Sequence, residues 1–426
     1  MRKEKLLHWG RWLLIALLLC SAVLLLRRTG YYAGIQARLE RSRSVLDRTE
    51  ELAGTVSAPQ LPAAAMLPQA VTVRSAEGGG RYGAAYDSEE TAAVFQRFSV
   101  DLSEALGSAG VPAERTEEDF RAWLDGCCVV FQFACPVQLE LLAGWLGVEV
   151  RSDAAGITAQ IVCLAALETE ALLCCRTAEG VCFACSTAVN ADGFRSRASE
   201  YAPNGAIYAW ESDRLTDGGD TLLLSSAPTA AAVKSAVPLV RGEEADAMLT
   251  AMGMNSFLAS SYSESDGTVV YVSEDNTLRI SPTGAVFYRR AGTPDAGRQD
   301  RLIDVVGRAW QVAEQTVGPY LGDGALRFAG VEYNASQRSY TVLLDYVVDG
   351  IPVRLGSGYA AEIVVRGDTV IQVRLQLRRF TRMQERTEML PCLQAAAIAA
   401  RMQGRPELVY TDAGDATACT WVIADG

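Results

Sequence analysis

Cysteine is the residue type with the clearest potential for chemistry in this chain. Eleven cysteines are present. A Cys-x-x-Cys pair such as Cys182 and Cys185 occurs in redox and zinc sites. Here the pair lies in VCFACSTAV, which has a strand pattern and no helix start to lower a thiol pKa. We predict core cysteines among apolar neighbours, with one or two disulfides or a metal site as alternatives. The crowded region holds Cys127, Cys128, Cys135, Cys163, Cys174, Cys175, Cys182 and Cys185.

The scarcity of histidine and lysine excludes several kinds of active site. The single histidine, His8, precedes the apolar N-terminal segment, so the body cannot form Ser-His-Asp, Cys-His or His-ligated zinc sites. Lys234 is the only lysine after Lys5, and no S-x-x-K, phosphate-loop or EF-hand sequence occurs. Hydrolysis by paired carboxylates remains the enzymatic alternative. We predict a protein that is not an enzyme, with no catalytic, cofactor-binding or metal-binding residues.

Charge is distributed unevenly along the chain. Residues 1–50 carry ten basic and four acidic side chains, whereas the whole chain has a formal net charge of −12. The remainder is therefore strongly acidic. Nucleic-acid binding requires clustered Lys and Arg side chains on the body, so no nucleic-acid partner is expected.

The N-terminus is predicted to contain a transmembrane anchor. Residues 12–26, WLLIALLLCSAVLLL, contain no charge, Pro or Gly. A helix of this length spans about 22 Å, and snorkelling arginines with local bilayer thinning can make up the difference to a full span. A cleaved signal peptide and a buried soluble helix are the alternatives, but no small-x-small cleavage site follows. The predicted anchor residues are Trp12, Leu13, Leu14, Ile15 and Leu26, flanked by Arg11, Arg27 and Arg28.

The orientation of this anchor rests on the flanking charges. Basic residues before the span favour a cytoplasmic N-terminus, although further arginines follow the span. Large acidic domains can be translocated despite such charges. We expect a single-pass protein of the cell membrane with an extracytoplasmic body.

Four segments are predicted. Residues 1–28 form the cytoplasmic tip and anchor, and residues 29–70 form a juxtamembrane helix with an Ala/Pro linker. Residues 71–240 form an N-terminal α+β region, and residues 241–426 a C-terminal domain. The juxtamembrane helix has a heptad-like stripe that is either a partner-helix face or a solvated stalk. Two of its six positions, Ser42 and Thr49, are polar, and the possible partner-helix face consists of Tyr32, Ile35, Leu39 and Leu46.

The body is predicted to be α+β, with helices packed on antiparallel sheets. In the N-terminal region we expect a helix capped near Asp87, a capping box from Thr116 to Asp119, and a helix beginning at Pro136. In the C-terminal region, apolar residues at helical spacing predict a helix over residues 302–317 lying on a meander of strands, one of which is expected over residues 369–379.

The C-terminal motifs resemble those of a known family. Asp266-Gly267-Thr268 leads into Tyr271, Leu278-x-Ile280-Ser281-Pro282-x-Gly284 leads into Tyr288, and LDYVVDGIPV occupies residues 344–353. These features resemble the YycH/YycI family of Gram-positive bacteria, accessory proteins of the WalK sensor histidine kinase. The resemblance covers residues 240–426 in pattern and the remainder in architecture, and the cysteine-rich region departs from it.

The resemblance implies a regulatory role rather than catalysis. The expected protein would bind a sensor histidine kinase and a related accessory protein, and would tune a response that controls cell-wall metabolism. The alternative function is a membrane-tethered module that binds cell-wall material or a peptide. A groove around Trp310 and Tyr346 would be its binding site, unless these aromatic residues belong to the core.

Overall fold

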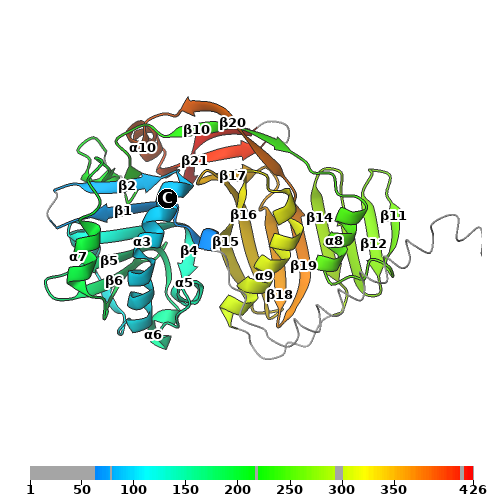
Figure 1. Ribbon diagram of the computed structural model, residues 1–426, viewed down its shortest axis with the longest axis horizontal. Coiled ribbons are helices and arrows are strands. Elements are labelled where there is room, and N and C mark those ends of the chain that lie inside the picture. The colour runs from blue at the N-terminus through cyan, green and yellow to red at the C-terminus, as the bar shows by residue number, and fades with distance from the viewer. Residues whose placement is uncertain (1–62, 77–78, 216–218, 293–300, 413–416, 426) are drawn as a thin grey trace, which may run out of the picture. The chain divides into compact units, whose positions relative to one another are not determined.

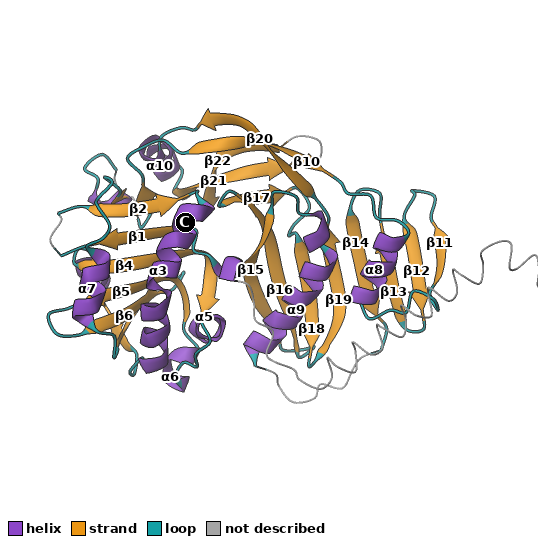
Figure 2. Ribbon diagram, in the orientation of Figure 1, coloured by secondary structure: helices purple, strands orange, loops and turns teal. Residues whose placement is uncertain are grey.

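A computed structural model describes residues 63–425, apart from residues 77–78, 216–218, 293–300 and 413–416. The compact unit to which these residues belong spans Pro59–Gly426. The predicted α+β class is confirmed for this part of the chain, which contains two large sheets with helices packed on them (Figures 1 and 2).

The first sheet has seven strands in the order β2-β1-β4-β5-β6-β7-β3, and every neighbouring pair is antiparallel. Its strands are β1 (Ala70–Arg74), β2 (Arg81–Ala85), β3 (Ala113–Arg115), β4 (Cys127–Gln138), β5 (Thr158–Ala166), β6 (Ala171–Arg176) and β7 (Cys182–Ser186).

Both faces of this sheet are covered. On one face, Val129 and Phe131 of β4 pack under helices, whereas Cys128 and Val130 point to the other face. Because neither face is exposed to solvent, the sequences of these strands are nearly continuous runs of apolar residues. The first face carries α3 (Ser88–Ser108), α5 (Leu139–Trp145) and α7 (Ala191–Ala198), and the short α6 (Ser152–Ala155) adjoins α5; the second carries α4 (Glu117–Leu124), β8 (Ile207–Tyr208), η2 (Ala209–Glu211) and β9 (Leu222–Leu223).

Two predicted helix caps are confirmed and one predicted helix start is wrong. The Asp87 carboxylate accepts hydrogen bonds from the backbone N–H groups of Glu89 and Glu90. Thr116 and Asp119 form the reciprocal capping box of α4. Pro136, however, lies inside β4, where the pairing with β5 is interrupted between Gln132 and Val137. A proline lacks an N–H group, so it fits an interruption of the ladder as well as a helix start.

The second sheet contains thirteen strands, in the order β11-β12-β13-β14-β19-β18-β16-β17-β21-β22-β10-β20, with β15 pairing β16. The antiparallel prediction fails at β17 and β21, which run parallel. The strands are β10 (Thr229–Ala236), β11 (Ser260–Ser263), β12 (Val269–Ser273), β13 (Asn276–Ile280), β14 (Ala285–Arg290), β15 (Ala325–Asn334), β16 (Ser339–Val348), β17 (Ile351–Leu355), β18 (Ala361–Arg366), β19 (Thr369–Gln376), β20 (Arg379–Glu388), β21 (Gly404–Asp412) and β22 (Thr417–Asp425).

The predicted helix over residues 302–317 is confirmed as α9 (Leu302–Thr316), which packs on β16 and β18 (Figure 1). Trp310 is 7% exposed and Tyr346 is 0% exposed, and both belong to the main core. These two aromatic side chains therefore belong to the core, which is the interpretation that the sequence analysis set against a binding groove. Two further helices are α8 (Glu243–Ala251) and α10 (Cys392–Arg401), and η3 (Gly318–Tyr320) follows α9.

The structure differs from the sequence-based expectation in three other places. Part of the predicted linker forms η1 (Ala63–Met66), in which Met66 is buried, and Ala70 begins β1. Strand β10 precedes residue 240 but joins the large sheet by pairing with β20. The segment expected to be one strand over residues 369–379 divides after Gln376, and β20 leaves toward β10.

Candidate functional site

The site residues predicted from the sequence lie outside the described part of the chain. This applies to the anchor with its flanking arginines (residues 11–28) and to the partner-helix face of Tyr32, Ile35, Leu39 and Leu46. Both therefore stay predictions. Within residues 63–425, none of the described helices is sufficiently long and apolar to span a bilayer.

The eight cysteines of the crowded region are side chains of the first sheet, on β4 to β7. Cys182 and Cys185 lie in β7, as the sequence predicted, but they belong to the cores on opposite faces of the sheet. Residues three apart in a strand point in opposite directions, so this pair cannot act as a redox dithiol. All cysteines in the described ranges are free thiols. Burial raises the pKa of the Cys174 and Cys175 thiols, which disfavours the reactive thiolate.

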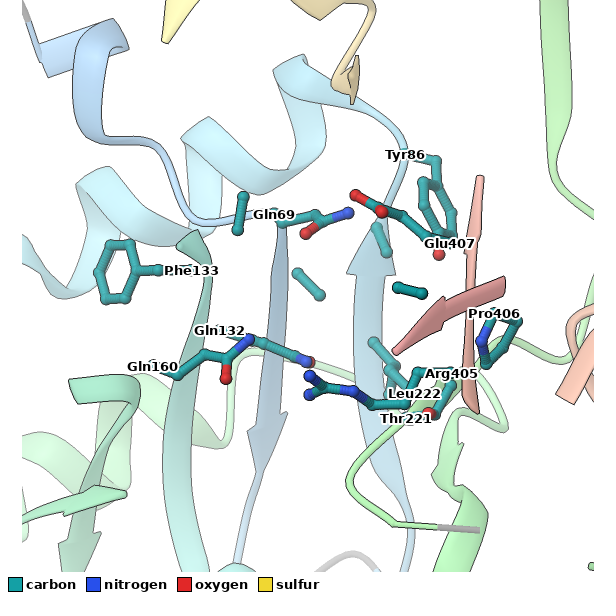
Figure 3. A pocket seen from close by; sticks show the side chains of 14 residues that line it. Gln69, Tyr86, Gln132, Phe133, Gln160, Thr221, Leu222, Arg405, Pro406 and Glu407 are labelled. Carbon is teal, nitrogen blue, oxygen red and sulfur yellow. The ribbon is translucent and has the colours of Figure 1, made fainter. Parts of the chain in front are cut away.

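A polar cavity of about 130 Å³ lies beside β1, β2 and β21 (Figure 3). Its lining combines amide, hydroxyl and charged side chains. Arg405 lies at the end of the cavity where Gln132 also extends, and Gln69 and Glu407 approach each other at the other end. The polar side chains of the lining are Gln69, Tyr86, Gln132, Gln160, Thr221, Arg405 and Glu407.

The charges in this cavity suit ligand binding rather than proton transfer. Glu407 forms an ion pair with Arg354. Burial raises the pKa of the Tyr86 phenol, so that group stays protonated and acts as a hydrogen-bond donor or acceptor. The sequence did not identify these residues because they come from six separate segments that only the fold assembles.

A second feature is the free edge of the large sheet at β11. This strand pairs with β12 on one side and with no described strand on the other. Leu258, which precedes the strand, is 69% exposed, and Tyr262, within the strand, is 55% exposed. We call Phe257, Leu258, Tyr262 and strand β11 the edge patch. An open strand edge beside exposed apolar side chains can accept a strand of another protein.

No family model and no curated protein sequence matches the chain. The crystal structure of YycH from Bacillus subtilis is similar, with a TM-score of 0.56 and 12% sequence identity. The superposition covers 86% of this chain and 97% of that chain. The described part of this chain therefore has a YycH-like fold.

The structural similarity extends further along the chain than the sequence resemblance. The motifs quoted above lie after residue 240, whereas a superposition covering 86% of the chain must include most of the cysteine-rich first sheet. The cysteine-rich region therefore differs from the YycH/YycI pattern in its side chains but shares the backbone architecture.

Proposed function

We propose that this protein is a membrane-anchored accessory protein that regulates a two-component sensor histidine kinase through protein–protein contacts. The observation that carries the proposal is the YycH-like fold over 86% of the chain, joined to the YycH/YycI-like motifs of residues 248–290 and 344–353. The regulated response would be cell-wall homeostasis.

The mechanism we propose is a shift in the kinase's conformational population. An accessory protein changes signalling only to the extent that it binds one kinase state more tightly than the other. The anchor would hold the body beside the kinase, and the edge patch would supply one contact surface. The predicted partner-helix face at Tyr32, Ile35, Leu39 and Leu46 would supply a second contact next to the membrane.

The test is co-purification of the full chain from membranes with a sensor histidine kinase of the same cell, followed by kinase autophosphorylation in reconstituted vesicles. We expect a stable complex and a change in the autophosphorylation rate when the accessory chain is present. The control is the chain without residues 1–58, which removes the predicted anchor but leaves the Pro59–Gly426 unit. A released body that regulates the kinase as well as the full chain would contradict the membrane-dependent mechanism.

A further inference from the structure

One buried charge in the described structure differs from the others. The charged side chains that are at least nine-tenths buried are Arg81, Asp101, Arg327 and Asp412. Arg81 donates to Glu211 and to the Leu124 carbonyl, and its guanidinium lies 4.4 Å from the Tyr208 ring centroid.

The two buried aspartates are also satisfied. Asp101 accepts hydrogen bonds from Arg197. Asp412 accepts one from Arg378 at 2.8 Å. Each of these three buried charges therefore has a partner of opposite charge, which offsets the free-energy cost of removing the charge from water.

Arg327 has no such partner among the described residues. Its side chain lies on β15 and is 8% exposed, and its Nε is enclosed without a hydrogen-bond acceptor. Desolvation lowers the pKa of the guanidinium. Burying an unpaired cation costs several kcal/mol of folding free energy. A buried cation kept at that cost is expected to serve an anion that is not part of the chain.

The guanidinium of Arg327 lines a cavity of about 290 Å³. Alternate residues of β15 and of the paired β16 form one wall, because side chains two apart share a face of the sheet. Residues 67–69 and the first turn of α3 also line the cavity. The volume lies near the lower end of the ~300–1,000 Å³ typical of small-molecule sites.

The same cavity contains an unsatisfied acceptor. Asp349 lies in the turn after β16, and its Oδ1 accepts a hydrogen bond from Arg382 at 2.6 Å. Its other carboxylate oxygen, Oδ2, has no hydrogen-bond donor, and the nearest cation, Arg386, lies 3.8 Å away. Asp323 and Glu89 also line the cavity. The lining is therefore cationic at Arg327 and acidic at Asp349, Asp323 and Glu89.

We propose that this cavity binds a small zwitterion, an amino acid or a dipeptide, with its carboxylate on Arg327 and its amino group on Asp349. The carboxylate would meet Arg327, which forms no ion pair with a described residue, and the amino group would meet Asp349, whose Oδ2 has no hydrogen bond although Arg382 holds its Oδ1. A purely anionic ligand would satisfy Arg327 but would face the three acidic side chains. This site would make the protein a sensor of a small solute, and it does not depend on the proposed kinase contact.

The ligand class is tested by isothermal titration calorimetry on the detergent-solubilised full chain. Probes are L-alanine, L-alanyl-L-alanine, N-acetyl-L-alanine, which lacks the ammonium, and L-alaninamide, which lacks the carboxylate. We expect alanine or the dipeptide to bind at least about tenfold more tightly than either single-charge analogue, since each lost charged hydrogen bond removes about that much affinity. Equal binding of N-acetyl-L-alanine, preferential binding of inorganic phosphate, or no binding of any probe at millimolar concentration would overturn the proposal.

Two variants locate the site. Arg327→Met removes the cation and is expected to abolish binding while the protein stays folded, because an unpaired buried charge is replaced by an apolar chain. Asp349→Asn removes the anion and is expected to weaken binding about tenfold. Asn tolerates the positive backbone φ of 51° at this position, so the turn should persist.

The matched control is Arg401→Met, an exposed arginine at the end of α10. It should leave binding unchanged. If Arg327→Met fails to fold, Arg327→Lys and Asp349→Asn decide between the outcomes. Unaltered dipeptide affinity in these two folded variants would refute the assignment.

Discussion

Arg327 and Asp345 lie directly opposite each other on β15 and β16, yet neither side chain forms an ion pair with a described residue. Burial raises the pKa of the Asp345 carboxyl to about 6, and the nearby Arg327 only partly offsets this effect. The desolvation of this carboxylate is therefore not compensated by a hydrogen-bonded ion pair with Arg327. The arrangement leaves the guanidinium available to a ligand instead of locking it into an internal pair.

The raised pKa of Asp345 predicts a specific dependence of stability on pH. An acid whose folded pKa exceeds its unfolded value of about 3.9 binds more protons when folded, so its contribution to stability falls as pH rises from about 4 through 6. Asp345→Asn should therefore be more stable than the wild type at pH 7, by up to about 3 kcal/mol, and equally stable at pH 4. Urea midpoints at both pH values measure this difference.

The control for this measurement is Asp368→Asn, at an exposed turn position. It should change stability little at either pH. A gain from Asp345→Asn that is the same at pH 4 and pH 7 would show that titration of this carboxyl is not responsible.

The Arg378–Asp412 ion pair should contribute far more to stability than its surface counterparts. Its Nε–Oδ2 distance is 2.8 Å, and the Asp412 side chain is 1% exposed. Removing one partner leaves the other charge buried, so Asp412→Ala should lower the free energy of unfolding by about 3–5 kcal/mol. The exposed Arg374–Glu362 pair supplies the comparison, because Glu362→Ala should cost about 1 kcal/mol or less. Equal losses in urea denaturation would contradict this ranking.

A smaller loss of unfolding free energy is expected when the capping box of α4 is removed. The Thr116 hydroxyl accepts a hydrogen bond from the Asp119 N–H at 3.1 Å, and Asp119 accepts one in return. Thr116→Ala should cost about 1 kcal/mol, measured by chemical denaturation. Thr116→Ser retains the hydroxyl and should cost much less. If serine and alanine were equally costly, the lost methyl group rather than the cap would be the cause.

The edge patch predicts a loss of partner binding without loss of stability. Leu258→Asp and Tyr262→Asp place charges beside β11 and should reduce co-purification of the sensor kinase several-fold. Both positions are exposed, so the unfolding free energy should change by about 0.5 kcal/mol or less. Val100→Asp on α3, where the side chain is 74% exposed, is the matched control. Normal kinase recovery with both patch variants would remove this surface from the proposal.

Local sequence patterns predicted the elements that depend mainly on residues close together in the chain, such as an amphipathic helix or a helix cap. The spacing of apolar residues predicted α9 almost to the residue, and the polar residues preceding α3 and α4 predicted their caps. The strand position of Cys182 and Cys185 was also predictable, because it depends on neighbouring side chains. Polar strands such as β11 and β20, with little apolar alternation, were missed.

The sequence by itself determined the apolar N-terminal run, the lack of histidine in the body, the α+β class and the helix lying on a sheet. Only the tertiary structure decided which charges are buried without partners. Arg327, Asp349 and Glu89 are distant in sequence, and no local pattern marks them as neighbours. Their meeting depends on the register of β15 with β16 and on the packing of α3 against that turn, where a Cβ atom on Gly350 would lie 2.8 Å from the Ser88 nitrogen. Such contacts arise from long-range packing, which one-dimensional patterns do not encode.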